Sequence, residues 1–145
     1  MTCHLLDVNV LIALLWPAHE GHERVHHWFR QRSGEGWATC PFTQAAFVRI
    51  SSNPAFSRDA VEPQEAINIL EVNLRHPHHQ FWADDLSFLK AALPFCSKLT
   101  GHQQVTDAYL LGLALHRKGK LVSLDRGVLG LLPDRSMERE LVVVL

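Results

Sequence analysis

The stretch from Val105 to Gly127 constrains the fold most strongly, because it predicts a helix, a tight turn and a buried strand in direct succession. Asp107 opens the expected helix, where unpaired N–H groups and the helix dipole favour an anion. Gly119 is a typical helix stop, and the apolar segment Lys120–Ser123 then predicts a strand with Asp125 just past its end. Because ligands bind outside the carboxyl ends of strands in an open parallel sheet, we expect Asp107 and Asp125 to meet at one edge of such a sheet.

A third aspartate follows the first predicted strand. Cys3–Leu6 is that strand, Asp7 comes directly after it, and Asn9 is expected to cap the helix Val10–Leu15. Taken singly, such acids are more often ordinary helix or turn residues. Three carboxylates at one edge, however, repel each other unless a cation lies between them. Mg²⁺ or Mn²⁺ is the usual partner of an all-oxygen ligand set, so the three acids together indicate a metal site.

Short apolar strands alternate with helices through the rest of the chain. Further strands are expected over residues 37–40, 78–82 and 141–145, and helices over residues 19–32, 43–51, 63–75 and 86–93, with a helical turn at 126–132. This alternation is typical of an α/β sandwich around a mostly parallel sheet. The length of 145 residues suits one domain with one core, spanning residues 1–145.

Several positions in these helices carry expectations of their own. Thr43 and Asp85 stand where they can cap the helices over residues 43–51 and 86–93. The core face of the helix over residues 63–75 is expected to consist of three apolar side chains, Ile67, Leu70 and Leu74.

The composition limits the classes of function. The chain is 47% hydrophobic and 20% charged, as in ordinary soluble proteins. It has no apolar run of about 18 residues that could span a membrane and no secretory start, so we expect a cytoplasmic protein. The three cysteines, Cys3, Cys40 and Cys96, are widely spaced, which favours free thiols. The net charge of −1 lacks the basic excess of many nucleic-acid-binding proteins, so any RNA role would depend on a local patch or a bound metal.

Four segments then match a known pattern in the same order: Leu5–Leu11, Cys40–Arg49, Val105–Leu110 and Leu124–Gly127. They resemble the motifs of PIN-domain nucleases, and most closely the VapC type, the toxin half of type II toxin–antitoxin pairs. The resemblance implies a PIN-like α/β/α fold and an endoribonuclease that depends on Mg²⁺ or Mn²⁺. It also implies an RNA substrate, a homodimer and inhibition by a small antitoxin protein. In this pattern the catalytic and metal-binding acids are Asp7, Asp107 and Asp125.

One residue departs from the family pattern. A glutamate usually follows the threonine of the second motif, and here Gln44 follows Thr43. Glutamine keeps a carbonyl oxygen that can face a metal-bound water but brings no charge, so a second metal should bind more weakly than a first. Asp84 or Asp85 could supply the missing charge, unless they are a solvated turn residue and a helix cap. The alternative is therefore a catalytically weak or inactive PIN-like domain that binds RNA or an antitoxin.

Divalent metal can activate water, neutralise the scissile phosphate and assist the leaving oxygen. We expect Asp7 and Asp107 to be direct ligands and Asp125 to bind directly or through water. Polar neighbours are expected to orient the waters or the carboxylates, namely Asn9, Thr43, Gln44 and Thr106. Two arginines are candidates for contact with phosphate, although surface arginine is the commoner role: Arg49 and Arg126.

The sequence also matches parts of the motifs of two other enzyme classes. His22-Glu23-Arg24-Val25-His26 fits the HExxH pattern of zinc proteases, which places both rings on one helix face. Such an enzyme needs a third protein ligand, and the sequence does not identify one. A phosphatase of the haloacid-dehalogenase type would need a second aspartate two positions after Asp7, where this chain has Asn9.

Overall fold

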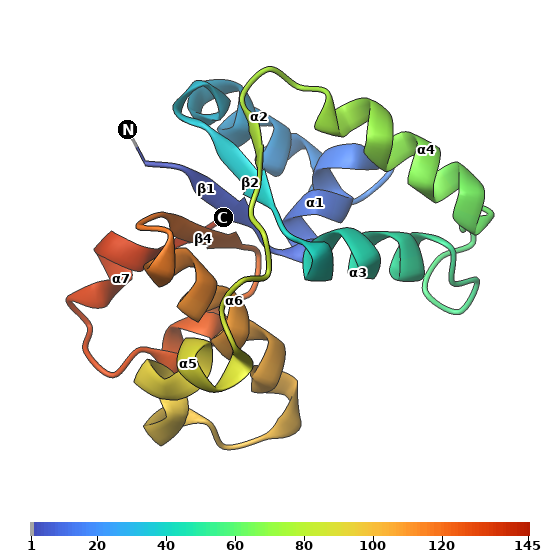
Figure 1. The fold of residues 1–145 in the computed structure, drawn as a ribbon. Coiled ribbons are helices and arrows are strands. Elements are labelled where there is room, and N and C mark those ends of the chain that lie inside the picture. Colours follow the sequence, from blue (N-terminus) through green and yellow to red (C-terminus); the bar gives the residue numbers. More distant parts are fainter. Residues whose placement is uncertain (1) are drawn as a thin grey trace.

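A five-stranded sheet forms the centre of the computed structural model, which describes residues 2–145 (Figure 1). Its strands are β1 (His4–Leu6), β2 (Trp37–Thr39), β3 (His79–Phe81), β4 (Lys120–Ser123) and β5 (Val142–Val144). They lie in the order β3-β2-β1-β4-β5, and every pair of neighbours is parallel. The expected parallel α/β architecture is confirmed.

Helices cover both faces of this sheet (Figure 1). One face carries α1 (Val8–Leu15), α2 (His22–Arg32), α3 (Pro41–Ser51) and α4 (Pro63–Leu74). The other carries α5 (Phe88–Ala92), α6 (Val105–His116) and α7 (Met137–Leu141). Short 3₁₀ segments connect these elements, at Ser33–Glu35, Leu93–Lys98, His102–Gln104 and Arg126–Leu131. Residues 2–145 contain no helix that has both the length and the apolar character for crossing a bilayer.

The strands divide the buried apolar residues into two cores because successive side chains point to opposite faces. Leu5 and Leu121 pack with α6, whereas their neighbours Leu6 and Val122 pack with α1. All four side chains are completely buried. The expected single core is therefore two clusters, one on each side of the sheet.

Helix starts differ from the expected ones in three places. Asn9 is not a cap: Asp7 is the N-cap of α1, and its Oδ1 accepts a hydrogen bond from the Val8 N–H at 2.7 Å. Thr43 lies inside the first turn of α3, because that helix already begins at Pro41, a residue suited to a first helical position. Asp107 is the third residue of α6 rather than its first.

The region after β3 differs most from the structure that the sequence predicts. Asp85 does not cap a helix, since Ser87 is the N-cap of α5 and its hydroxyl accepts from the Lys90 N–H at 3.2 Å. The helix expected to reach residue 93 ends at Ala92 and continues as a 3₁₀ segment. In α4, Leu70 is buried as expected, whereas Ile67 is 44% exposed and Ala66 takes the inward position.

Candidate active site

The strand order places two of the predicted acids side by side. From β1 the chain moves to β2 and β3 on one side, and it returns at β4 on the other side of β1. The gap between the carboxyl ends of β1 and β4 is thus the switch point at which open parallel sheets bind ligands. Asp7 directly follows β1, and Asp125 follows β4 after one intervening residue. Both therefore lie at this switch point.

Asp7 is a buried carboxylate with two hydrogen bonds. It is 5% exposed. Its Oδ1 accepts from the Val8 N–H at 2.7 Å, and its Oδ2 accepts from the Ser123 hydroxyl at 2.8 Å. Burial raises the pKa of Asp7 most strongly, the two hydrogen bonds oppose that rise, and the charge of Asp125 adds to it. The hydrogen bonds fix the orientation of this carboxylate at the start of α1.

Ser123, the last residue of β4, connects the polar groups of the switch point. Its hydroxyl donates to Asp7 and accepts from the Asn9 side-chain amide at 3.3 Å and from the Asp125 N–H at 3.0 Å. One donor and two lone pairs are thereby all used. Asn9 also accepts from the Leu124 N–H at 3.1 Å, which ties α1 to the segment after β4. The sequence reasoning missed Ser123; its only signal was a hydroxyl at the end of an apolar strand, two positions before Asp125.

Asp107 reaches the same place from the first turn of α6. It is half-buried, and its pKa is raised to about 7, first by burial and then by the charges of Asp7 and Asp125. Among residues 2–145, neither a hydrogen bond nor a cation opposes this rise. The structure thus brings all three predicted aspartates within electrostatic range, with Asp125 the exposed member.

The three aspartates interact through their charges without forming a closed cage. Within residues 2–145, no three side chains of His, Cys, Asp or Glu lie close enough together to hold a metal ion as they stand. The donor set nevertheless suits a hard cation, because all its atoms are carboxylate oxygens. A cation between the carboxylates would also remove the repulsion that raises the pKa of Asp107.

Gln44, in the first turn of α3, belongs to a chain of polar side chains at the end of β2. Its amide Nε2 donates to the Thr39 hydroxyl at 2.9 Å, and that hydroxyl lies 2.8 Å from His79 Nε2. This leaves the carbonyl oxygen of Gln44 as the group it can offer to a ligand. Thr43 is buried and bonded to the backbone of Cys40, whose N–H donates to its hydroxyl at 3.0 Å.

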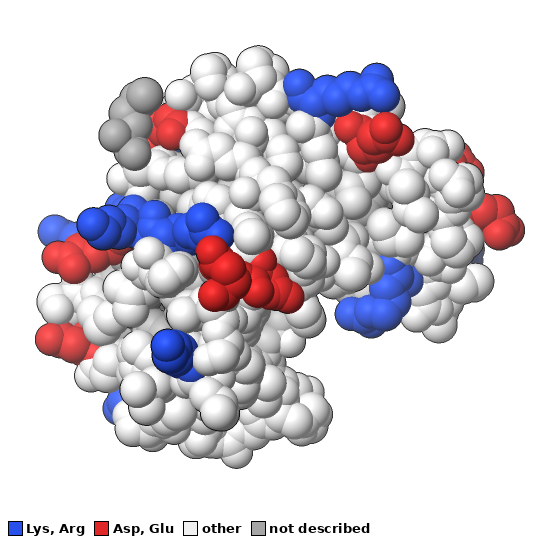
Figure 2. Space-filling view, viewed as in Figure 1, with Lys and Arg blue, Asp and Glu red and all other residues white. Residues whose placement is uncertain are grey.

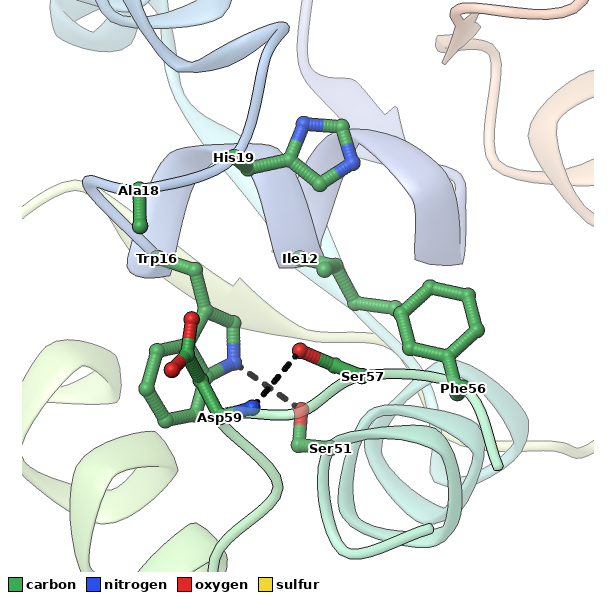
Figure 3. A pocket seen from close by; sticks show the side chains of 8 residues that line it. All are labelled: Ile12, Trp16, Ala18, His19, Ser51, Phe56, Ser57 and Asp59. Atoms are coloured by element: carbon green, nitrogen blue, oxygen red, sulfur yellow. Dashed lines mark hydrogen bonds between the residues drawn. The ribbon is translucent and has the colours of Figure 1, made fainter. Parts of the chain in front are cut away.

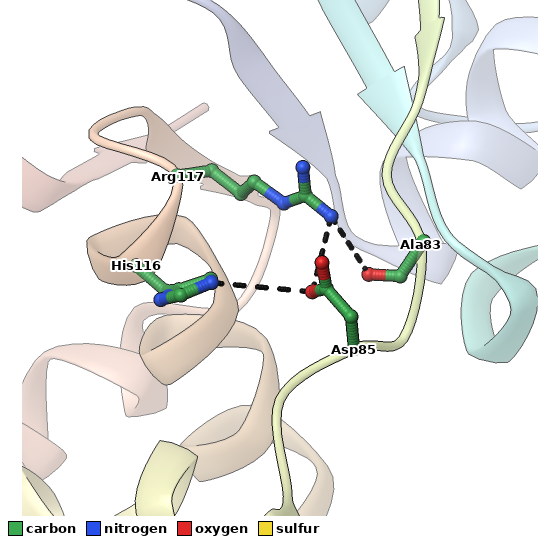
Figure 4. Close-up of polar contacts among 4 residues, drawn as sticks. All are labelled: Ala83, Asp85, His116 and Arg117. Atoms are coloured by element: carbon green, nitrogen blue, oxygen red, sulfur yellow. Dashed lines mark hydrogen bonds and ion pairs between the residues drawn. The ribbon is translucent and has the colours of Figure 1, made fainter.

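Of the two acids after β3, Asp85 contacts the end of α6 that is opposite to Asp107. Asp85 lies 3.1 Å from the Arg117 guanidinium and 3.9 Å from His116, and Arg117 also donates to the Ala83 carbonyl (Figure 4). Arg117 follows Asp107 by ten residues, about 15 Å along a helix axis. Asp85 therefore neutralises Arg117 and brings no charge to the three aspartates. Asp84 lies near Tyr109. Burial, and then the charges of acids that include Asp84 and Asp85, raise the pKa of Tyr109 to about 12.

The remaining predicted residues lie on the surface or at its margin. Thr106 is half-buried in the first turn of α6, and Arg49 and Arg126 are exposed. Arg126 borders a hollow of about 650 Å³ together with Lys98 and Arg135. On the face shown in Figure 2, acidic and basic side chains are intermixed, and large areas carry neither. Any positive surface near the site is thus local.

A separate hollow between α1 and α3 is too small for a nucleotide. Its volume is about 90 Å³, and it is lined by Ile12, Trp16, Ser51 and Phe56 among others (Figure 3). The Trp16 indole N–H donates to the Ser51 hydroxyl at 3.1 Å across one side of it. None of the three aspartates lines it. The switch point is therefore the better candidate for chemistry.

The zinc-protease pattern is not completed. His22 and His26 do lie next to each other on α2, with ring centroids 5.3 Å apart. No third His, Cys, Asp or Glu joins them, since residues 2–145 contain no group of three such side chains that could hold a metal.

Comparisons with known proteins agree with this geometry. The sequence matches the family model of the PIN domain over residues 4–129. It is 43% identical over 131 residues to Ribonuclease VapC38 of Mycobacterium tuberculosis, covering 90% of this chain and 91% of that protein. It is 42% identical over 121 residues to Ribonuclease VapC39 of the same species, covering 83% and 87%. Its fold is similar to a crystal structure of VapBC2 from Rickettsia felis bound to a promoter DNA fragment, with a TM-score of 0.68, 9% identity and coverage of 99% and 98%.

Proposed function

Because this chain belongs to the PIN-domain family, we propose that it is a ribonuclease of the VapC type, the toxin of a toxin–antitoxin pair. It hydrolyses RNA phosphodiester bonds with the help of Mg²⁺ or Mn²⁺. The observation that carries the proposal is the half-buried Asp107, whose pKa is raised to about 7 by burial and by two further carboxylates at the switch point of a parallel sheet.

Asp7 and Asp107 would hold the ion, with Asp125 binding directly or through water. When bound, such an ion supplies charge neutralisation at the phosphate and a water of lowered pKa. The protein contributes orientation: Val8 N–H and the Ser123 hydroxyl hold both oxygens of Asp7 in fixed directions. Asp107 gives up its proton when a cation binds, because metal ligands must be deprotonated.

The polar neighbours would position these groups. Asn9 and Ser123 hold the segment of Asp125 against α1. Gln44 would turn its carbonyl oxygen toward a metal-bound water while its amide stays on Thr39. Thr106 borders Asp107 in the sequence. Arg49 and Arg126, both exposed, would contact phosphates of the RNA away from the ion.

Two assembly properties belong to the same proposal. The chain would bind a small antitoxin protein, and it would form a homodimer. The related structure from Rickettsia felis is of VapBC2, which supports a protein partner. Light scattering of the purified chain, alone and with its antitoxin, would measure both.

The test of the function is cleavage of structured RNA by wild type, Asp7→Asn and Asp107→Asn with Mg²⁺ or Mn²⁺. We expect wild type to cut and both variants to lose activity, whereas Asp134→Asn, at an exposed position outside the site, should keep it. Undiminished cleavage by Asp107→Asn would remove the assignment of the active site.

The second candidate function is a PIN-like domain that binds RNA or an antitoxin without cutting. Gln44, which brings no charge to the position of the usual glutamate, is the observation that favours it. Wild-type protein that binds RNA and shows no metal-dependent cleavage would support this candidate instead.

A further inference from the structure

The two histidines at the start of α2 form a pair that the acidic site does not use. His22 and His26 are four positions apart, so both rings lie on one helix face. Their centroids are 5.3 Å apart and their planes differ by 20°. Both rings line a hollow of about 410 Å³, whose other side is formed by Trp37 and His76. Because Trp37 begins β2, this hollow lies toward the amino ends of the strands, away from the aspartates.

A hydrogen bond determines which nitrogen of His22 is free. Its Nδ1 lies 2.8 Å from the carbonyl oxygen of Ala13 in α1. A carbonyl can only accept, so Nδ1 carries the hydrogen, and Nε2 of the neutral ring keeps its lone pair. Metal-bound histidines usually donate their other N–H to a carbonyl or carboxylate in this way. The first ring of the pair is thus already oriented as a metal ligand.

His76, on the other side of the hollow, has the opposite arrangement. Its Nδ1 accepts from the Trp37 indole N–H at 3.1 Å and from the His78 N–H at 3.1 Å. The lone pair of Nδ1 is therefore in use, and the neutral ring carries its hydrogen on Nε2. His76 cannot serve as a third ligand in this state, which leaves two protein nitrogens.

We propose that His22 and His26 form a two-imidazole site for a transition-metal ion of the Zn²⁺, Ni²⁺ or Cu²⁺ class. Imidazole suits these ions, whereas Mg²⁺ and Mn²⁺ prefer oxygen ligands. With metal–nitrogen bonds of about 2.0–2.1 Å, two imidazoles on one tetrahedral ion have centroids about 5 Å apart. The observed 5.3 Å is close to this separation, but the rings are stacked with their planes 20° apart, so the exposed His26 ring must turn before both Nε2 lone pairs point at one ion. Water occupies the remaining coordination positions.

The experiment uses Cu²⁺ as the probe, because nitrogen ligands leave a hyperfine signature in its electron paramagnetic resonance spectrum. The full chain is titrated with Cu²⁺ in excess Mg²⁺. We expect one equivalent bound with imidazole nitrogen couplings, and at least tenfold weaker binding in His22→Ala and in His26→Ala. His27→Ala, an exposed histidine of the same helix outside the pair, is the matched control and should bind like wild type.

A second arm separates the pair from the acidic site. In Asp107→Asn the nitrogen signature should remain, because the aspartates offer only oxygen ligands. Zn²⁺ should also raise the melting temperature of wild type and of His27→Ala, and it should leave the melting temperature of His26→Ala unchanged. Because the ring of His26 is exposed, we expect His26→Ala to fold like wild type. A wild-type spectrum without nitrogen coupling, or the same coupling in the double variant His22→Ala/His26→Ala, would overturn the proposal.

Discussion

The switch point between β1 and β4 and the contact between α5 and α6 differ in what constrains them. At the switch point, burial first and then the like charges of Asp7 and Asp125 raise the pKa of Asp107 to about 7. Where α6 crosses α5, a Cβ atom on Gly112 would lie 2.1 Å from the Ala91 carbonyl oxygen. In the first region the carboxylates repel each other, and a bound cation would reduce that repulsion. In the second region no room exists for an added methyl group at Gly112. Changes at the first should therefore alter ligand binding, and changes at the second should alter folding.

The largest effect is expected at the helix contact. Gly112→Ala places its methyl group against backbone rather than against a flexible side chain, so the two helices must separate. We expect the free energy of unfolding to fall by about 3 kcal/mol. Urea denaturation measures this loss. Gly130→Ala is the control, since nothing lies within 4 Å of its added methyl group, and equal stability of the two variants would contradict the packing argument.

At the switch point, Asp107→Asn should separate activity from stability. Loss of an outer partner of a metal site already costs roughly 10–100-fold, so RNA cleavage should fall by more than roughly 100-fold when a ligand is lost. The metal-free protein should become more stable by about 2 kcal/mol at pH 8, a figure reduced from the full shift to allow for partial exposure.

The pH dependence of that gain follows from the direction of the shift. The pKa of Asp107 is raised from 3.8 to about 7, so the folded protein binds this proton more tightly than the unfolded chain does. Wild type is therefore stabilised at low pH and loses that stability as the pH rises through about 7. Asparagine does not titrate, so the two melting curves should converge near pH 4. A constant difference between them at all pH values would show that folding does not raise the pKa of Asp107.

Ser123→Ala should have a smaller effect on both properties. It removes a hydrogen bond to the buried Asp7 and two more to Asn9 and the Asp125 backbone. We expect stability to fall by about 1–2 kcal/mol and the Mg²⁺ affinity to fall by about tenfold. Calorimetry with Mg²⁺ measures the second quantity. Ser97→Ala, at an exposed position, should leave both unchanged.

The smallest effect is expected at Gln44. Gln44→Glu adds a carboxylate where the family pattern usually has one, and each added charge near a cation strengthens its binding. The apparent Mg²⁺ affinity and the cleavage rate should each rise several-fold, on the order of 3–10-fold. Gln64→Glu, on the exposed surface of α4, supplies the same charge at a distance. If both variants behave alike, Gln44 does not face the ion.

The sequence predicts some of these residues better than others. Asp7 and Asp125 follow apolar strands, and that local pattern is enough to place them at one edge of a parallel sheet. Ser123 was missed because its role depends on which strand lies beside β4, and strand neighbours are not encoded locally. Asp85 was expected to cap a helix, but a long-range ion pair with Arg117 competes with that local preference. Ile67 was expected inside because helical periodicity identifies a face, but not which edge of that face the neighbouring helix covers.

The three aspartates come from distant parts of the chain, and the last of them precedes only a 3₁₀ segment, α7 and the final strand, β5. A ribosome that has made the first hundred residues has therefore produced a polypeptide without α6, β4 or β5, and hence without two of the acids. Such a fragment would not be able to cleave RNA. If the three aspartates form the active site as proposed, premature termination or early proteolysis would leave the chain without it, and activity would begin only when synthesis is nearly complete.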